Sequence, residues 1–226
     1  KLDRALKLDA ERPEAILLKG RLAELNGRPD LAVAAYEAFL AKGEDDLGTR
    51  LFLAAQAARQ GNGAEAVKHL EAAVHRLLGV GVAALMAAAV VNVSWQVASR
   101  FLLGSPSSFT DELARYLLVW IGLLGGAYAA GERRHIAVDL LPGSLDAKAG
   151  RALALFTHGV VMLFALAVMV GGGARLVWLS FALGQTTAAL GVPLGVGYTV
   201  VPLAGALVAF YGACGLLDAR RAGGET

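Results

Sequence analysis

Four stretches of this chain carry no charged side chain, and they limit its possible folds more than any other feature. They comprise residues 77–99, 116–131, 152–174 and 176–217. Charged groups are costly in hydrocarbon and cheap at its edges, so uncharged apolar runs framed by charged clusters are typical of membrane-crossing helices. A helix needs about 20 mostly apolar residues to span a bilayer. The sequence therefore predicts a membrane domain in residues 77–226.

The fourth stretch is too long for one upright helix, and turn-forming residues interrupt it: Gly184, Gly191, Pro193, Gly195 and Gly197. We expect the third helix to continue past Arg175, followed by a loop and then a fourth helix. The second stretch reaches spanning length if it begins near Leu113, with Arg115 free to extend toward water. The predicted spans are residues 77–99, 113–131, 152–183 and 197–217.

The charged residues divide the chain into two parts. Residues 1–76 carry 24 of the 40 Lys, Arg, Asp and Glu, which leaves 16 for the rest. Such a break indicates two bodies in different solvents. A net charge of +2 gives no reason to expect a nucleic-acid partner. The single cysteine, Cys214, allows no disulfide or cysteine-based metal site within one chain.

The first part repeats with a period of 34 residues. Segments 13–46 and 47–80 align, so that Gly27 matches Gly61 and Ala32 matches Ala66. We predict helices at residues 14–25, 31–42, 47–60 and 64–77, an all-α arrangement of helical hairpins. This part, residues 1–76, resembles tetratricopeptide (TPR) repeats, although it lacks their tryptophan. Residues 1–12 are expected to be the closing helix of an earlier repeat. A protein or peptide partner in the repeat groove and a merely structural role both stay open.

Positive charges predict the orientation of the spans. The segment between spans two and three carries Arg133, Arg134, Lys148 and Arg151, and Arg220 and Arg221 follow span four. The loop between spans three and four has no charge. Because positive residues favour the cytoplasmic side, both termini are expected there. Little linker separates the last repeat helix from the first span, so the two are expected to be continuous.

An ordered series of motifs in residues 77–221 resembles one family. The motifs are Asn92-Val93, Arg100-Phe101, the run from Asp111 to Tyr116, Val119-Trp120, Gly125-Gly126-Ala127, the run from Arg134 to Asp139, the run from Gly184 to Pro193, Tyr198 and Pro202-Leu203. They are similar to the small membrane subunit of tripartite ATP-independent periplasmic (TRAP) transporters, the DctQ-like family. Thr187-Ala188 departs from the Thr-Pro that the family often has, and the family does not normally carry a repeat domain.

The resemblance implies a four-helix subunit in the bacterial inner membrane. Its partners would be a large permease subunit, which holds the substrate and sodium sites, and a periplasmic substrate-binding protein that delivers organic acids. The small subunit would brace the large one and bind no substrate, cofactor or metal itself. The chain is therefore not expected to be an enzyme.

Three groups of residues are candidates for subunit contacts or for fixing the topology. Asp111, Glu112 and Arg115 at the entrance of span two either hold a partner subunit or form a solvated cluster. Trp120 lies deeper and is a candidate partner contact. After span two, the candidate membrane or subunit anchors are Arg133, Arg134, His135 and Asp139. Gln185, in the uncharged loop, is a candidate periplasmic contact.

Two other functions are weighed against transport. A membrane-anchored repeat adaptor would recruit partner proteins and transport nothing. A haem-bearing anchor of a redox enzyme would use His158, within span three, but no second histidine lies at a comparable depth. Arg175 stays ambiguous: near the membrane edge it would extend to water, whereas deep in the membrane it would need a carboxylate. The polar end of span one contains groups that often form hydrogen bonds between helices: Asn92, Ser94, Trp95 and Gln96.

Overall fold

The computed structural model describes residues 12–102, 104, 107–132 and 147–221. The chain separates into two compact units, residues 1–77 and 78–226. The described residues form helices and no strand, which confirms the all-α fold class. Among them, four helices are long and apolar enough to cross a membrane: Gly63–Leu102, Ser108–Gly131, Ala149–Ala182 and Leu194–Arg220.

Unit 1 contains α2 (Pro13–Leu25), α3 (Pro29–Ala41), α4 (Leu47–Arg59) and the first part of α5 (Gly63–Leu102). Helices α2 and α3 begin earlier than predicted because a proline occupies the first helical position, where no amide hydrogen is needed. The TPR assignment stays a prediction, and residues 1–11 lie outside the described residues.

The two equivalent glycines of the 34-residue period end their helices in the same way. Gly27 and Gly61 adopt positive φ angles of 67° and 76°. After each, an amide bonds back to a carbonyl five residues earlier, from Arg28 to Ala23 and from Asn62 to Ala57, both at 2.9 Å. This is the Schellman ending, which favours glycine because glycine has no Cβ to oppose a left-handed backbone.

Tyr36 is the central side chain of unit 1. Its ring packs on Gly20, where a Cβ would collide with it, and lies edge-on to Phe52 at a centroid distance of 5.2 Å. Its hydroxyl donates a 2.8 Å hydrogen bond to Glu24. The ring therefore joins α2, α3 and α4 in one core that also buries Leu53.

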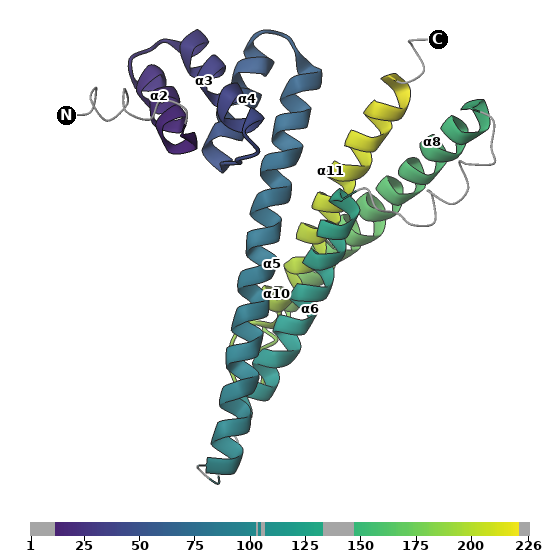
Figure 1. Ribbon diagram of the computed structural model, residues 1–226. Helices are drawn as coiled ribbons and strands as arrows, with labels where there is room; N and C mark the ends of the chain where they lie inside the picture. The colour runs from purple at the N-terminus through teal and green to yellow at the C-terminus, as the bar shows by residue number, and fades with distance from the viewer. Residues whose placement is uncertain (1–11, 103, 105–106, 133–146, 222–226) are drawn as a thin grey trace. The chain divides into compact units, whose positions relative to one another are not determined.

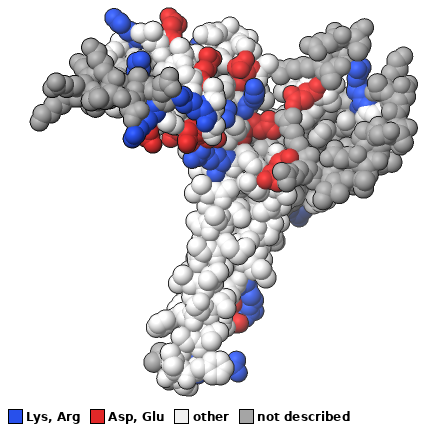
Figure 2. All heavy atoms as spheres, in the orientation of Figure 1, with Lys and Arg blue, Asp and Glu red and all other residues white. Residues whose placement is uncertain are grey.

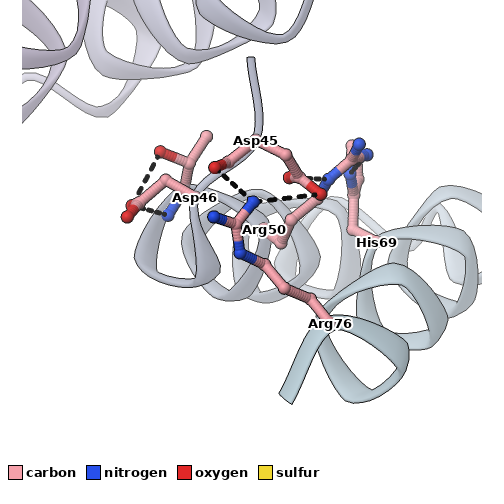
Figure 3. Close-up of polar contacts among 6 residues, drawn as sticks. Asp45, Asp46, Arg50, His69 and Arg76 are labelled. Atoms are coloured by element: carbon pink, nitrogen blue, oxygen red, sulfur yellow. Dashed lines mark hydrogen bonds and ion pairs between the residues drawn. The ribbon is translucent and has the colours of Figure 1, made fainter. Parts of the chain in front are cut away.

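A polar network joins the loop before α4 to α4 and α5 (Figure 3). Asp46 caps α4 by accepting a 3.0 Å hydrogen bond from the Thr49 amide. Arg50 binds the Asp45 carboxylate at 2.8 Å and lies 3.4 Å from the ring of His69. From α5, the Arg76 guanidinium donates a hydrogen bond to the backbone oxygen of Asp45 and forms an ion pair with the Asp45 carboxylate.

This network predicts that unit 1 is sensitive to acid. Burial, and next Arg50, lower the pKa of His69 below 6.5; Lys68 acts in the same direction, while Glu65 and Glu37 oppose it. The folded state therefore disfavours the protonated imidazole. Stability contributed by neutral His69 is present above pH 6.5 and decreases as the pH falls toward the folded pKa, by at most about 1.4 kcal/mol per pH unit.

Hydrogen exchange of residues 47–77 in the full chain, corrected for intrinsic rates, measures this effect between pH 7.5 and pH 5.5. We expect faster local opening at the lower pH in the wild type, and a smaller pH effect in His69→Gln. An equal pH dependence in His69→Gln and the wild type would contradict the assignment to His69.

Helix α5 continues without a break from unit 1 into unit 2 (Figure 1). This confirms that the last predicted repeat helix runs directly into the first predicted span. Unit 2 then contains α6 (Ser108–Gly131), α8 (Ala147–Phe164), the π-helix η2 (Ala165–Gly172), α9 (Gly173–Ala182), α10 (Leu194–Tyr198) and α11 (Val200–Arg221). Figure 2 shows charged side chains gathered over unit 1, and few along the visible surface of the unit 2 helices.

Helix α11 packs against α6, α8 and η2. Glycines make the close approach possible: a Cβ on Gly205 would lie 2.5 Å from the Cβ of Met169, and one on Gly212 would lie 3.2 Å from that of Met162. Near the end of α11, the ring of His158 fills the space over Gly215. Small residues allow membrane helices to gain van der Waals contact in this way, since water does not drive their association.

Side chains also join α5 to α6 within unit 2. The buried Asn92 amide donates a 2.8 Å hydrogen bond to the backbone oxygen of Thr110. The ring of Tyr128 packs on Gly79, where a Cβ would lie 2.9 Å from it. Of the four polar residues expected to bond between helices, Asn92 does so, whereas Ser94 and Trp95 are exposed.

Candidate functional site at the connecting loop

The connecting loop, residues 183–193, joins α9 to α10 and begins with a glycine-dependent turn. Gly184 has a φ of 60°. Its amide bonds to Phe181 at 3.1 Å, and the next amide, from Gln185, bonds to Ser180 at 3.2 Å. This is a third Schellman ending, and it turns the chain sharply out of α9.

The rest of the loop folds on the buried Thr187. Its amide bonds to the Val192 oxygen at 2.9 Å, and its hydroxyl accepts a bond from the Val192 amide at 3.0 Å. Gly191, with a φ of 65°, donates to the Thr187 oxygen at 3.2 Å. Leu194 donates to the Gln185 oxygen at 3.0 Å and closes the loop. The loop is therefore a compact structure and not an extended connection.

A carboxylate from α6 binds the tip of this loop. Oε2 of Glu112 accepts hydrogen bonds from the amides of Ala189 at 2.7 Å and Leu190 at 3.1 Å. Hydrogen bonds to an ionised acceptor are stronger than neutral ones. Glu112 thus joins α6 to residues 77 and 78 positions further along the chain.

Two aromatic residues of α6 extend this contact to α10. The indole nitrogen of Trp120 donates a 3.0 Å hydrogen bond to the Gly197 oxygen. The ring of Tyr116 packs on Gly197, leaving no room for a Cβ, and Phe181 of α9 packs on Gly195, where a Cβ would lie 2.6 Å from its ring. The short helix α10 is therefore held between α6 and α9.

The other two charges of this cluster lie on the surface. Arg115 binds Asp111 at 2.5 Å across one turn of α6, with 76% and 58% of the two side chains exposed. Water and salt screen an exposed pair of this kind, so it contributes little to the stability of the helix. Of the three charged residues on this turn, Glu112 therefore binds the connecting loop, while Asp111 and Arg115 bind each other.

An apolar cavity of about 330 Å³ lies beside these contacts. It is bounded by α5, α6, the connecting loop and α10, through Leu85, Leu113, Tyr116, Leu117, Trp120, Thr187, Leu190, Val192, Pro193, Val196 and Gly197. The lining provides almost no polar group, so it suits hydrocarbon and not an organic acid.

The candidate residues from the sequence thus separate into three groups. Glu112 and Trp120 contact the connecting loop and α10. Asp111, Arg115 and the side chain of Gln185 are exposed. Arg133, Arg134, His135 and Asp139 lie outside the described residues.

The roles of Tyr116, Gly195 and Gly197 do not follow from the sequence pattern. Glycines 195 and 197 are predicted to interrupt the fourth stretch, with the last helix starting near residue 197, but this prediction is wrong because both lie inside α10. Helical glycine is otherwise unfavourable by about 1 kcal/mol relative to alanine, but here aromatic rings occupy the Cβ positions. The need for glycine at these two positions comes from aromatic rings on α6 and α9, so it cannot be seen in the residues next to the glycines.

Comparisons with known proteins cover most of unit 2. The profile of the family described as tripartite ATP-independent periplasmic transporters, DctQ component, matches residues 89–222. A putative TRAP transporter small permease protein of Haemophilus influenzae is 31% identical over 134 residues, which are 58% of this chain and 78% of that protein.

Two further relatives are similar over shorter parts of their lengths. The sialic acid TRAP transporter small permease protein SiaQ of Vibrio cholerae is 34% identical over 39% of this chain and 51% of its own length. The ectoine TRAP transporter small permease protein TeaB of Halomonas elongata is 34% identical over 56% of this chain and 63% of its own length.

Proposed function

This chain belongs to the DctQ-component family of TRAP transporters, and we propose that it braces a large permease subunit during cation-coupled uptake of an organic acid. The observation that carries the proposal is the family match over residues 89–222, which includes three of the four candidate spans and part of the first. The partners would be the large permease subunit and a periplasmic substrate-binding protein.

The packing of unit 2 supports a bracing role. Glu112 and Trp120 join α6 to the loop and α10, and glycines bring α11 close to η2 and α8. A rigid unit of this kind can hold a moving neighbour in place. Its outer faces are strongly apolar, and Leu118 on α6 is 71% exposed. These faces are suited to lipid and to the large subunit.

The charge pattern supports an orientation in the inner membrane. Both termini and the segment between α6 and α8 would lie in the cytoplasm, with Arg133 and Arg134 as anchors near lipid phosphates. The connecting loop would then face the periplasm, where Gln185 is exposed and available to a partner. Unit 1 would be a cytoplasmic TPR-like segment with a protein or peptide partner.

Co-purification tests the assignment. The full chain is expressed together with a large TRAP permease subunit from the same organism, and one subunit carries the affinity tag. We expect both subunits to elute together in mild detergent. Proteoliposomes that contain both subunits and the binding protein should accumulate an organic acid in response to a sodium gradient. Omitting this chain should reduce that uptake.

Two results would contradict the proposal. One is that the large permease does not co-purify with this chain, although each protein folds when it is expressed alone. The other is equal uptake with and without this chain. A membrane-anchored adaptor predicts the first result and retention of soluble proteins through residues 12–77 instead.

A further inference from the structure

Arg175 presents a cation on the outer face of a candidate membrane span. Helix α9 buries Gly173 and Ser180. Arg175 follows Gly173 by two residues, a rotation of about 200° around the helix, so it leaves from the opposite side. It is exposed, as are its neighbours Leu176 and Leu179. Among the residues that the structure describes, none forms an ion pair with Arg175.

Helix length determines the depth of this cation. Arg151 precedes Arg175 by 24 residues, and no charged residue lies between them. At the α-helical rise of 1.5 Å per residue, they are separated by at most about 36 Å along the helix, because the wider turns of the π-helix η2 rise less per residue. The hydrocarbon core is about 30 Å thick, and a typical tilt of about 20° reduces the separation only slightly. With Arg151 at one edge of the core, Arg175 therefore lies at the opposite edge.

Trp178 gives an independent indication of the same depth. It follows Arg175 by about one turn and is 68% exposed. Exposed tryptophan in membrane proteins concentrates at the level of the lipid headgroups. The arginine stem can lie along hydrocarbon while its guanidinium reaches that level.

The carboxylates that the structure describes at this end of unit 2 are already engaged. At the end of unit 2 where α9 meets the connecting loop, Glu112 binds the loop amides and Asp111 binds Arg115. An anion that pairs with Arg175 would therefore come from outside the described residues. Phosphate is abundant at this depth, and a guanidinium can bind it through two parallel hydrogen bonds.

We propose that Arg175, next to Trp178, binds the phosphate of a phospholipid in the leaflet opposite to Arg151. The ligand is a phosphate-bearing lipid headgroup whose acyl chains lie along the exposed apolar face of α9. Together with Arg151, this contact fixes the height and the rotation of the helix from α8 to α9 in the bilayer.

Native mass spectrometry of the purified, delipidated full chain in mild detergent tests the site. The probes are phosphatidylglycerol and a diacylglycerol with the same acyl chains, which lacks the phosphate. We expect Arg175→Gln to weaken the tightest phosphatidylglycerol binding about five-fold, the factor that corresponds to about 1 kcal/mol per basic residue at a membrane surface. Arg175→Lys should retain part of the binding, and diacylglycerol binding should not change.

Arg115→Gln is the matched control, because this exposed guanidinium is already paired with Asp111. It should bind phosphatidylglycerol like the wild type, and all variants should unfold at the same temperature. Unchanged phosphatidylglycerol binding by Arg175→Gln overturns the proposal, as does an equal loss for diacylglycerol or in Arg115→Gln. The proposal is also overturned if Arg175→Gln no longer binds the large permease subunit but still binds phosphatidylglycerol like the wild type. That result would indicate that Arg175 pairs with a carboxylate of the partner protein.

Discussion

Replacing Gly205 with valine should destabilise unit 2 more than any other single substitution considered for this chain. A Cβ at this position would lie 2.5 Å from the Met169 side chain, 3.1 Å from the Val170 nitrogen and 3.2 Å from the Ala165 oxygen. Two of these neighbours are backbone atoms of the π-helix, which cannot rotate away as a side chain can. Helices α11 and η2 must therefore separate. We expect a loss of about 3 kcal/mol, at the upper end of the usual cost of overpacking.

Gly126→Val in α6 is the matched control. It also places valine within a candidate span, but nothing lies within 4 Å of the added Cβ. Since valine favours helix more than glycine does, this variant should be neutral or slightly more stable. Titration with a denaturing detergent, followed by tryptophan fluorescence, gives the midpoint for each variant. Equal midpoints for both variants would show that the α11 contact is looser than the structure indicates.

Replacing Glu112 with alanine should release the connecting loop from α6. The carboxylate accepts two amide hydrogen bonds, and neither amide donates to another acceptor among the described residues. Hydrogen bonds to charged groups contribute about 1.5–3 kcal/mol each, less where water can replace them, as at the exposed Ala189. We expect a loss of about 2 kcal/mol, so the amides of Ala189 and Leu190 should exchange hydrogen about 30-fold faster.

Hydrogen exchange at these two amides measures the effect, and Asp111→Ala is the control. Asp111 is one residue away and also carries a carboxylate, but among the described residues its ion-pair partner is the exposed Arg115. Its removal should change exchange in the loop less than three-fold. Glu112→Gln, which keeps an acceptor oxygen and loses the charge, should lie between alanine and the wild type. Similar exchange in Glu112→Ala and Asp111→Ala would refute the assigned contact.

Patterns among neighbouring residues were sufficient to predict most of the helices and two of the turns between them. The period of 34 residues located the turns at Gly27 and Gly61, and both end their helices with positive φ. The uncharged stretches predicted four spans, and four candidate helices are present among the described residues. A short segment prefers water or hydrocarbon according to the hydropathy of its own residues. A left-handed turn likewise depends on a glycine at one position.

The candidate site was predictable only in part. The cluster at the entrance of span two was identified, but sequence alone could not separate Glu112, which binds the loop, from Asp111, which pairs with Arg115. Both are acidic and lie on the same turn. The difference depends on the direction of each side chain and on a loop 77 residues away.

The sequence by itself determined the organisation of this protein: a charged helical segment joined through one helix to an apolar domain of the DctQ-component family. It did so because charge, hydropathy and glycine turns act over a few residues. Only the tertiary structure decided three features. Gly195 and Gly197 belong to a helix, position 205 has no space for a Cβ, and Glu112 binds the connecting loop. Each of these depends on an atom contributed by a distant segment, and steric exclusion and hydrogen bonding act only where the folded chain brings such atoms together.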